Sequence, residues 1–373
     1  MTRLLVAAGG GGDAITAAVL HTALHGARTP ALVLTYAWER LVVDPVPGPR
    51  RAADFTGTEP AAPGLALVTP QTRPIAPAGS LLPRLATGLG PRLGLLDPYD
   101  GARGLARQIG AAARWCRAVR IDLVDVGGDI VARGDEPTLR SPLGDALALA
   151  ACAATGLPTT VYVAGPGLDN EVPPTELLPR LGEPAFVLTA PHTDGVMPVF
   201  DWHPSEASAL LVAAARGVRG VCGTRDAPRP VLLDDSACRV HRLTLDRALA
   251  LNPLARALAG STSLDEAEAA SRAVCGFSEI ERERHRAGTG PGTTRPPGSY
   301  GACAGDAETA EAVLARFAAW ERQLLADGLA YVTSRRITEE LGLTTPQART
   351  LFDALRATTP PRQAPPLWRL RRA

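Results

Sequence analysis

The sequence predicts an α/β fold with a Rossmann-like, mostly parallel sheet that has helices on both faces. Residues 121–154 carry most of this prediction. They begin with the apolar, β-branched run 121–126, which is typical of a buried strand, and two glycines then allow a tight turn. After a charged loop, Ser141-Pro142 begins a helix, with Ser as the N-cap and Pro at the first helical position. Strand, polar loop and capped helix together form half of a parallel α/β unit.

The N-terminal residues repeat this order of elements. Residues 4–8 are typical of a strand, four glycines follow, and residues 14–25 predict a helix that leads to a second strand at 31–35. Residues 158–164 predict a further buried strand, which ends in another glycine-rich turn. Ligands of parallel sheets bind at the carboxyl ends of the strands, so we expect the glycine-rich loops to meet at the functional site.

We expect three parts along the chain. Residues 1–285 form the Rossmann-like α/β domain, residues 286–304 form a Gly/Pro-rich linker or mobile loop, and residues 305–373 form a small C-terminal helical, winged-helix-like unit. Residues 218–222 or 231–233 are expected to continue the main sheet.

The C-terminal unit has a helix–turn–helix pattern followed by a short returning strand. Such a unit can contact DNA through Arg335, Arg336 and Arg349. The alternative, a helical cap that packs on the main domain, is the one we favour, because a fold does not fix a function.

Composition excludes several classes of protein. The chain has 373 residues, 46% hydrophobic residues and a net charge of +1, which indicates neither nucleic acid nor an acidic membrane as partner. No apolar run approaches the ~20 residues that cross a bilayer. The N-terminal residues lack the pattern of a signal peptide, so we expect a cytoplasmic protein.

The sequence contains no lysine, and all 39 basic residues are arginines. This excludes a Schiff-base lysine, and with it pyridoxal-phosphate chemistry, as well as the lysine of an ordinary P-loop. The six cysteines form no CxxC pair, which indicates reduced thiols and no zinc site.

The first glycine loop can present backbone N–H groups to an anion at a helix N-terminus. Its spacing is not GxGxxG, so it is a weak signature of dinucleotide binding. Asp13, which follows, suits a ribose hydroxyl, an amine or a metal better than a phosphate, while capping of the helix is the open alternative. We expect Gly10→Val to remove ligand binding and to leave the fold largely intact.

Acidic side chains follow the glycine turns and are expected to gather at one edge of the sheet. Crowded carboxylates repel one another, so one is protonated or a cation lies between them, and oxygen ligands select Mg²⁺ or Ca²⁺ over zinc. The alternative, that these acids are helix caps or exposed loop charges, is expected for roughly half of them. The expected catalytic residues are Asp129, Asp135, Glu136 and His203, and the expected metal ligands are Asp129, Asp135 and Asp169. The cofactor stays open, with Mg²⁺ as the candidate.

The expected ligand-binding residues come from the glycine loops and the charged residues next to them. They are Gly9, Gly10, Gly11, Gly12, Asp13, Gly127, Gly128, Arg133, Arg140, Gly165, Gly167, Asp169, Glu171 and Glu206. Among them, Arg133 and Arg140 could anchor a carboxylate or phosphate through two parallel hydrogen bonds.

Four segments resemble a family of proteins of unknown function, DUF1152. They are the opening GGGGD, the run GGDIVARGDE, the helix start SPLGDALALAA and the strand end GPGLDNE. The resemblance extends over residues 1 to about 250. It implies a Rossmann-like α/β fold and assigns no reaction.

Two classes of function remain. The first is a non-redox enzyme of hydrolase, lyase or transferase type that acts on a small polar or phosphorylated metabolite. The second is a nucleotide-sensing regulatory protein whose C-terminal unit contacts DNA or a partner. An NAD(P)-binding oxidoreductase is a third, weaker alternative, because GxGxxG is absent. Whether the chain forms a homo-oligomer is open.

Overall fold

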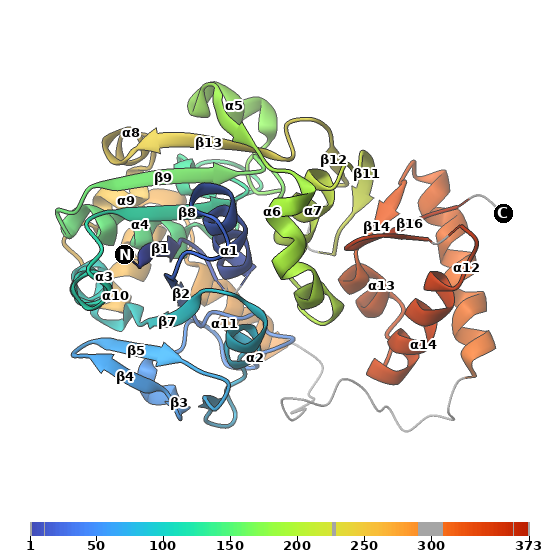
Figure 1. Ribbon diagram of the computed structural model, residues 1–373, viewed down its shortest axis with the longest axis horizontal. Helices are drawn as coiled ribbons and strands as arrows, with labels where there is room; N and C mark the ends of the chain where they lie inside the picture. The colour runs from blue at the N-terminus through green and yellow to red at the C-terminus, as the bar shows by residue number, and fades with distance from the viewer. Residues whose placement is uncertain (1, 11, 226–228, 290–308, 361, 372–373) are drawn as a thin grey trace.

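The computed structural model describes residues 2–371 except 11, 226–228, 290–308 and 361. Within these residues the chain is a mixed α/β protein with a large nine-stranded sheet, helices on both faces of that sheet, and a second, five-stranded sheet (Figure 1). Gly11 and residues 290–304 of the expected linker lie outside the described residues.

Five parallel strands form the centre of the large sheet, in the order β9-β8-β1-β2-β7. Every residue of β2 and of β8 is buried, as expected for central strands that are covered on both faces. The bounds of the five strands are Arg3–Ala7 for β1, Ala31–Tyr36 for β2, Arg92–Leu96 for β7, Ile121–Val126 for β8 and Thr159–Ala164 for β9.

Antiparallel strands widen this sheet on both sides. β13 pairs with β9 and β10 pairs with β13, while β5 pairs with β7 and β4 pairs with β5. Their bounds are Glu59–Ala62 for β4, Leu65–Val68 for β5, Pro184–Val187 for β10 and Arg239–Thr244 for β13. The short pair β3 (Phe55–Thr56) and β6 (Arg73–Pro74) forms a sheet of its own.

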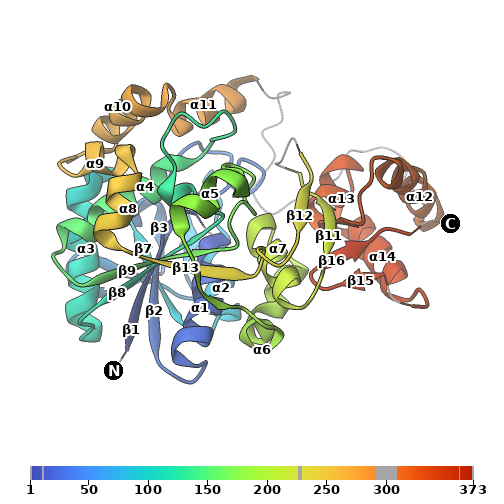
Figure 2. The same ribbon diagram turned by 90° about the horizontal axis from the view of Figure 1, so that it is seen from above.

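Helices cover the two faces of the large sheet (Figure 2). The two faces bury separate apolar cores. One face carries α1 (Gly12–His25), α2 (Leu82–Gly88), α6 (Ala190–Thr193) and α7 (Glu206–Ala215). The other face carries α3 (Gly101–Cys116), α4 (Pro142–Ala154), α8 (Leu245–Leu251), α9 (Pro253–Leu258) and α10 (Leu264–Cys275). Leu177 of α5 (Pro174–Leu181) and Ile280 of α11 (Glu279–Thr289) join this second core.

The second sheet combines two strands from the middle of the chain with three from its C-terminal part, in the order β12-β11-β14-β16-β15. Their bounds are Gly220–Gly223 for β11, Val231–Leu233 for β12, Tyr331–Val332 for β14, Gln363–Ala364 for β15 and Leu367–Arg369 for β16. The expectation that residues 218–222 or 231–233 continue the main sheet is therefore wrong. The place beside β9 in that sheet is taken by β13.

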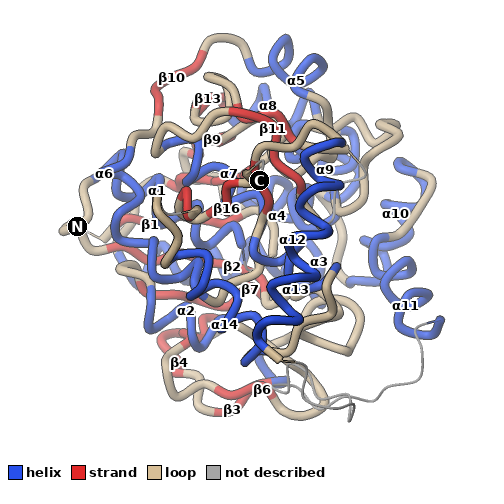
Figure 3. Tube along the Cα trace, turned by 90° about the vertical axis from the view of Figure 1, so that its right-hand side faces the viewer, coloured by secondary structure: helices blue, strands red, loops and turns tan. Residues whose placement is uncertain are grey.

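Three helices pack with the C-terminal strands (Figure 3). They bury a separate core that includes Phe317, Leu351 and Trp368. They are α12 (Ala310–Ala326), α13 (Ser334–Glu340) and α14 (Thr345–Arg356). We call α12, α13, α14 and strands β14 to β16 the C-terminal unit. Because its sheet also contains β11 and β12, the two parts of the chain share a continuous set of strands, and a division at residue 285 stays a prediction.

Among the described residues, no helix combines the length and the apolar character that a membrane span requires.

Candidate functional site

The carboxyl ends of β1, β8 and β9 lie side by side at one edge of the large sheet, because these strands are parallel neighbours. Asp125 is the next-to-last residue of β8. Asp13 lies in the first turn of α1, which follows β1, and Asp145 lies in the first turn of α4, which follows β8. Elements far apart in the chain thus bring three acids to one place.

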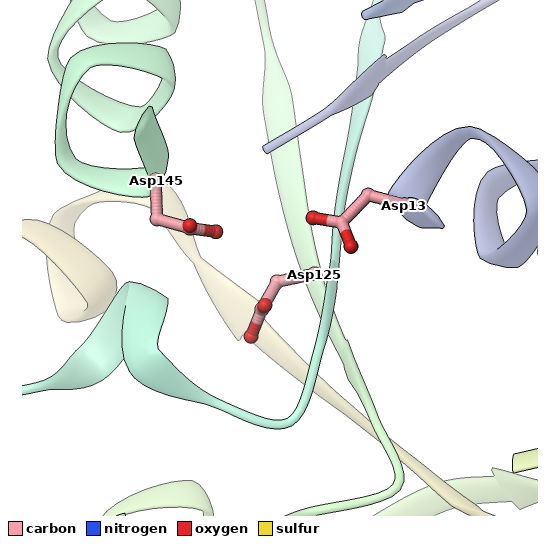
Figure 4. A group of neighbouring side chains, drawn as sticks. All are labelled: Asp13, Asp125 and Asp145. Atoms are coloured by element: carbon pink, nitrogen blue, oxygen red, sulfur yellow. The ribbon is translucent and has the colours of Figure 1, made fainter. Parts of the chain in front are cut away.

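Asp13, Asp125 and Asp145 each offer a carboxylate oxygen, and these oxygens lie within 4.8 Å of one another. Figure 4 shows the three side chains converging from α1, β8 and α4. Asp125 is 1% exposed and Asp145 is 4% exposed. Both oxygens of Asp125 and one of Asp145 are buried without a hydrogen-bond partner of acceptable geometry. Buried polar atoms normally have partners, and the nearest groups to Asp125 are Asp129 and the backbone of Gly128, so these oxygens mark a candidate binding site.

Asp129 and Asp169 complete the group, which we call the carboxylate cluster: Asp13, Asp125, Asp129, Asp145 and Asp169. Burial raises the pKa of Asp13 to about 7 and that of Asp169 to about 8. For Asp125, Asp129 and Asp145, burial and then the neighbouring carboxyls raise the pKa well above the usual range. Such mutual repulsion is expected of acids that share a site without a cation.

Glycines allow the loops after β8 and β9 to approach each other. Gly127 has φ +113°, and a Cβ atom there would lie 2.2 Å from Cγ of Asp169. The backbone N–H of Gly167 donates to the carbonyl of Gly127 at 2.6 Å. Gly128 and Gly165 also have positive φ. The predicted glycine positions therefore hold Asp169 against the end of β8.

The first glycine loop lies against the same cluster. The backbone N–H of Gly9 donates to Oδ2 of Asp13 at 2.6 Å. A Cβ atom on Gly10 would lie 2.4 Å from the carbonyl oxygen of Trp38, and one on Gly12 would lie 2.3 Å from Oγ of Ser205. Gly10→Val would therefore force the backbone of a neighbouring loop to move, contrary to the expectation that it leaves the fold intact.

Glu171 orients the start of α4. Its carboxylate accepts hydrogen bonds from the backbone N–H groups of Arg140 and Ser141, at 2.7 and 2.8 Å, and from the hydroxyl of Ser141. The guanidinium of Arg140 donates to the carbonyl of Asp169 at 2.8 Å. Both residues therefore lie beside the cluster, with bonds that shape its loops.

The structure does not bring Asp135 and Glu136 into the cluster. Asp135 is exposed, as is the predicted ligand-binding residue Arg133. Glu136 is buried and accepts from Arg180 at 2.6 Å and from two backbone N–H groups, which outweigh the effect of burial and lower its pKa. Of the three predicted metal ligands, Asp129 and Asp169 therefore belong to the cluster and Asp135 does not. Glu136 stabilises its own loop.

His203 and Glu206 form a separate corner at the junction with the C-terminal unit. His203 accepts from the backbone N–H of Ser205 through Nδ1, and burial followed by Arg40 and Arg84 lowers its pKa to about 3. Glu206 accepts from the hydroxyl of Thr333 and the backbone N–H of Arg225. The bond of His203 lies within its own loop, and its buried Nε2 has no hydrogen-bond partner among the described residues. Glu206 connects the start of α7 to Arg225 and Thr333, which is typical of a structural role.

The site residues expected from the sequence did not include Asp125 or Asp145. The signal for Asp125 was a carboxylate inside a mostly apolar strand; the second acid of that strand, Asp122, pairs with His25 at 2.7 Å. The signal for Asp145 was the one charged residue in an Ala/Leu-rich helix, one turn after its N-terminus. An acid in such a place requires either a partner or a function.

The larger of two described cavities has a volume of about 260 Å³ and is lined by residues that include Arg51, Tyr99, Ser263 and Arg284. The smaller one, about 20 Å³, lies between His203 and the C-terminal unit. Neither cavity is lined by a member of the carboxylate cluster. We therefore choose the cluster as the candidate functional site because of its chemistry and not because of a cavity.

A model of the family described as "Protein of unknown function (DUF1152)" matches residues 4–287. The match covers more than half of the chain, and the chain belongs to this family. Comparisons with curated proteins and with solved structures found no match.

Proposed function

We propose that this member of the DUF1152 family is a non-redox enzyme that acts on a polar or phosphorylated metabolite with the help of a divalent cation. The observation that carries the proposal is the convergence of Asp13, Asp125 and Asp145, with buried oxygens that lack partners. Three carboxylates without an imidazole or thiolate favour a hard cation such as Mg²⁺ or Mn²⁺. Such an ion can polarise a phosphoryl or carbonyl oxygen and can lower the pKa of a bound water.

The order of the parallel strands supports a Rossmann-like assignment and the position that we propose for the site. Numbered along the chain, the five parallel strands follow the order 3-2-1-4-5 across the sheet. The order reverses between β1 and β8, and α/β sheets of this kind bind ligands at that point. Asp13 and Asp125 belong to these two strand ends.

Charges beside the cluster support an anionic substituent on the substrate. Burial raises the pKa of Asp13 and of Asp169, and the positive charges of Arg40 and Arg140, respectively, partly oppose this rise. Asp13 accepts from Gly9, which puts a carboxylate over the glycine loop where a dinucleotide would present its pyrophosphate. This disfavours an NAD(P)-binding oxidoreductase.

The proposal is tested by titrating chelator-treated protein with Mn²⁺ in a calorimeter at pH 8. We expect a saturable exotherm or endotherm and an increase in melting temperature with the wild type. Asp145→Asn should lose this binding and should be at least about 1 kcal/mol more stable than the wild type in chelator, because one repelling carboxylate is removed. Asp135→Asn is the matched control on the neighbouring loop and should bind as the wild type does.

An activity screen completes the test. Sugar phosphates, nucleotides and p-nitrophenyl esters are incubated with the wild type and Asp145→Asn, with Mn²⁺ or with chelator. Turnover that depends on both the ion and Asp145 is the expected result. Absence of Mn²⁺ binding to the wild type, or equal binding by Asp145→Asn, would contradict the proposal.

A nucleotide-sensing regulatory protein is the second candidate, and the C-terminal unit favours it. Helix α12, strand β14, helices α13 and α14, and the hairpin β15–β16 follow one another in the order of a winged-helix-like unit. A nucleotide that binds tightly with Mn²⁺ and is recovered unchanged would favour this sensor over the enzyme.

A further inference from the structure

We propose that the larger cavity, at the carboxyl end of β7, binds a small metabolite through an oxyanion, a carboxylate or a phosphate, that Arg51 holds. The cavity has a volume of about 260 Å³. Tyr99, which follows the end of β7, lines it together with Arg51, Ser263, Asp265 and Arg284. Because β7, β2 and β1 are parallel, the cavity and the carboxylate cluster lie at the same edge of the sheet. The inference does not depend on the proposed cation.

One wall of the cavity belongs to the loop 46–49, which neighbouring side chains hold in place. The guanidinium of Arg50, which is 6% exposed, donates to three carbonyls of this loop and pairs with Asp44 at 3.1 Å. A backbone N–H of the loop donates to the buried Glu283 at 2.7 Å, and one of its carbonyls accepts from the hydroxyl of Tyr99 at 3.1 Å. A loop that is fixed in this way is ordered before a ligand binds, which reduces the cost of binding.

The other walls are the start of α10 and one side of α11. Just before α10, the hydroxyl of Ser261 accepts from the backbone N–H of Ala102 at 3.0 Å, and its carbonyl accepts from the backbone N–H of Arg103 at 3.1 Å. Arg284 of α11 donates to both oxygens of the buried Glu268 of α10, at 2.9 and 2.7 Å. Figures 2 and 3 show α10 and α11 side by side. These walls are therefore fixed to α3 and to each other.

Arg51 offers the cavity a positive charge that nothing in the described part of the chain neutralises. Its guanidinium lies over the ring of Tyr99, with Cζ 3.7 Å from the ring centroid, and makes no hydrogen bond or ion pair with the described residues. Both oxygens of the neighbouring Asp97 are taken by the backbone N–H groups of Ala52 and Tyr99. Stacking orients the planar guanidinium and leaves the N–H donors in its plane available for a carboxylate or phosphate.

The charges and the volume of the cavity define the class of ligand. Because Arg284 is paired with Glu268, the positive charge of Arg51 is the one that an oxyanion would neutralise. Asp265 adds a carboxylate, to which a hydroxyl or amine of the same ligand would donate. The volume lies below the range of about 300–1,000 Å³ that is typical of pockets for drug-sized ligands. A small acid or phosphorylated metabolite with a hydroxyl or amine group therefore fits better than a dinucleotide.

The test titrates inorganic phosphate and acetate, in separate calorimetric experiments, into full-length protein that a chelating resin has freed of cations. The wild type should bind at least one of these anions saturably. Arg51→Ala should increase the dissociation constant about tenfold or more, because a charge-assisted pair is lost. Asp265→Asn should bind the anion more tightly, since a repelling carboxylate is removed. Arg28→Ala is the matched control, because Arg28 is exposed just before β2, at the opposite edge of the sheet, and it should bind as the wild type does.

The outcomes also separate this inference from the proposed function. Tighter binding of phosphate assigns a phosphorylated ligand, and tighter binding of acetate assigns a carboxylic acid. No saturable binding of either anion to the wild type, or equal binding by Arg51→Ala, would overturn the inference. If Arg51→Ala fails to fold, as circular dichroism would show, Asp265→Asn decides, and weaker or unchanged binding by it contradicts the site. Arg51→Ala should bind Mn²⁺ as the wild type does, and loss of Mn²⁺ binding would overturn a site separate from the cluster.

Discussion

At the scale of single residues, Asp13 and Asp169 of the carboxylate cluster stay protonated at pH values at which ordinary carboxyl groups are ionised. The pKa of Asp13 is about 7 and that of Asp169 is about 8 in the folded protein. In the unfolded chain both carboxyls have the ordinary pKa of 3.8. Between these limits the folded chain holds more protons than the unfolded chain. Its free energy of unfolding therefore decreases as the pH rises, and the decrease ends above the folded pKa values.

We predict that, in chelator, the protein loses stability between pH 6.5 and 8.5. Asp169 alone would contribute on the order of 2 kcal/mol over this interval. His203, whose pKa falls from 6.5 to about 3 on folding, has the opposite effect, but only below pH 6.5. Urea denaturation at several pH values measures the change, and the double variant Asp13→Asn, Asp169→Asn should flatten it. A wild-type stability that is constant or rises over this interval would contradict the prediction.

The same residues show what the sequence could and could not predict about the site. Asp13, Asp129 and Asp169 were expected near one another, because acids after parallel strands must share an edge of the sheet. Asp135 was expected with them, but a loop pattern does not tell which side chains point inward. Asp125 was overlooked because a strand position becomes a ligand position only when its neighbours are known.

At the scale of elements, the sequence predicted helices and strands best where the apolar pattern or the helix start was clear. Strand β8 and helix α4 have the predicted bounds, since an apolar run and a Ser-Pro start are both local features. Strand β13 was not anticipated, and its pairing partner β9 lies 75 or more residues earlier in the chain. The pairing of β11 with β14 likewise joins distant segments, which no local pattern specifies.

The loop between β1 and α1 provides a prediction at this scale. A Cβ atom on Gly10 would lie 2.4 Å from the backbone carbonyl of Trp38, so even Gly10→Ala must displace a neighbouring loop. We expect it to destabilise the protein by about 1–3 kcal/mol. Gly90→Ala is the control, because nothing lies within 4 Å of its Cβ position, and it should change stability by less than about 0.5 kcal/mol. Chemical denaturation of both variants decides, and equal stabilities would refute the close approach.

At the scale of the whole molecule, one hydrogen-bonded corner joins the C-terminal unit to the main sheet. The hydroxyl of Thr333 donates to the buried Glu206 at the start of α7 and accepts from the backbone N–H of Arg336 as the N-cap of α13. Ser208, which also lies in the first turn of α7, donates from its hydroxyl to the carbonyl of Gly12 at 2.8 Å. The C-terminal unit is therefore connected through α7 to the helix that carries Asp13.

We predict that Thr333→Ala lowers stability by about 2 kcal/mol or more, from the lost cap and the unsatisfied Glu206. Amide hydrogen exchange should increase in both α13 and the first turns of α7. Thr344→Ala is the matched control, since Thr344 caps α14 without a bond to the main sheet. It should lose about 1 kcal/mol and leave exchange in α7 unchanged. Equal exchange in α7 for both variants would show that the corner does not couple the two parts.

The charge of the C-terminal unit leads to the last prediction, which concerns nucleic acid. Arg335 is 9% exposed and pairs with Glu339 at 2.6 Å, with Glu206 at 3.8 Å, so it is held inside the molecule. On α14, the exposed Arg349 lies one turn from the exposed Asp353. Binding to DNA needs a concentrated basic face, because released counterions supply most of the affinity.

The full-length protein should therefore give no discrete band in gel shifts with genomic fragments at moderate salt. A sharp band that weakens as salt increases, and that Arg349→Glu abolishes, would contradict this prediction and favour a DNA-binding sensor. The absence of a band would agree with the expectation that the C-terminal unit packs on the main domain. The exposed surface of α14, which combines Thr345, Arg349, Thr350 and Asp353, has the mixed polarity that contacts with another protein allow.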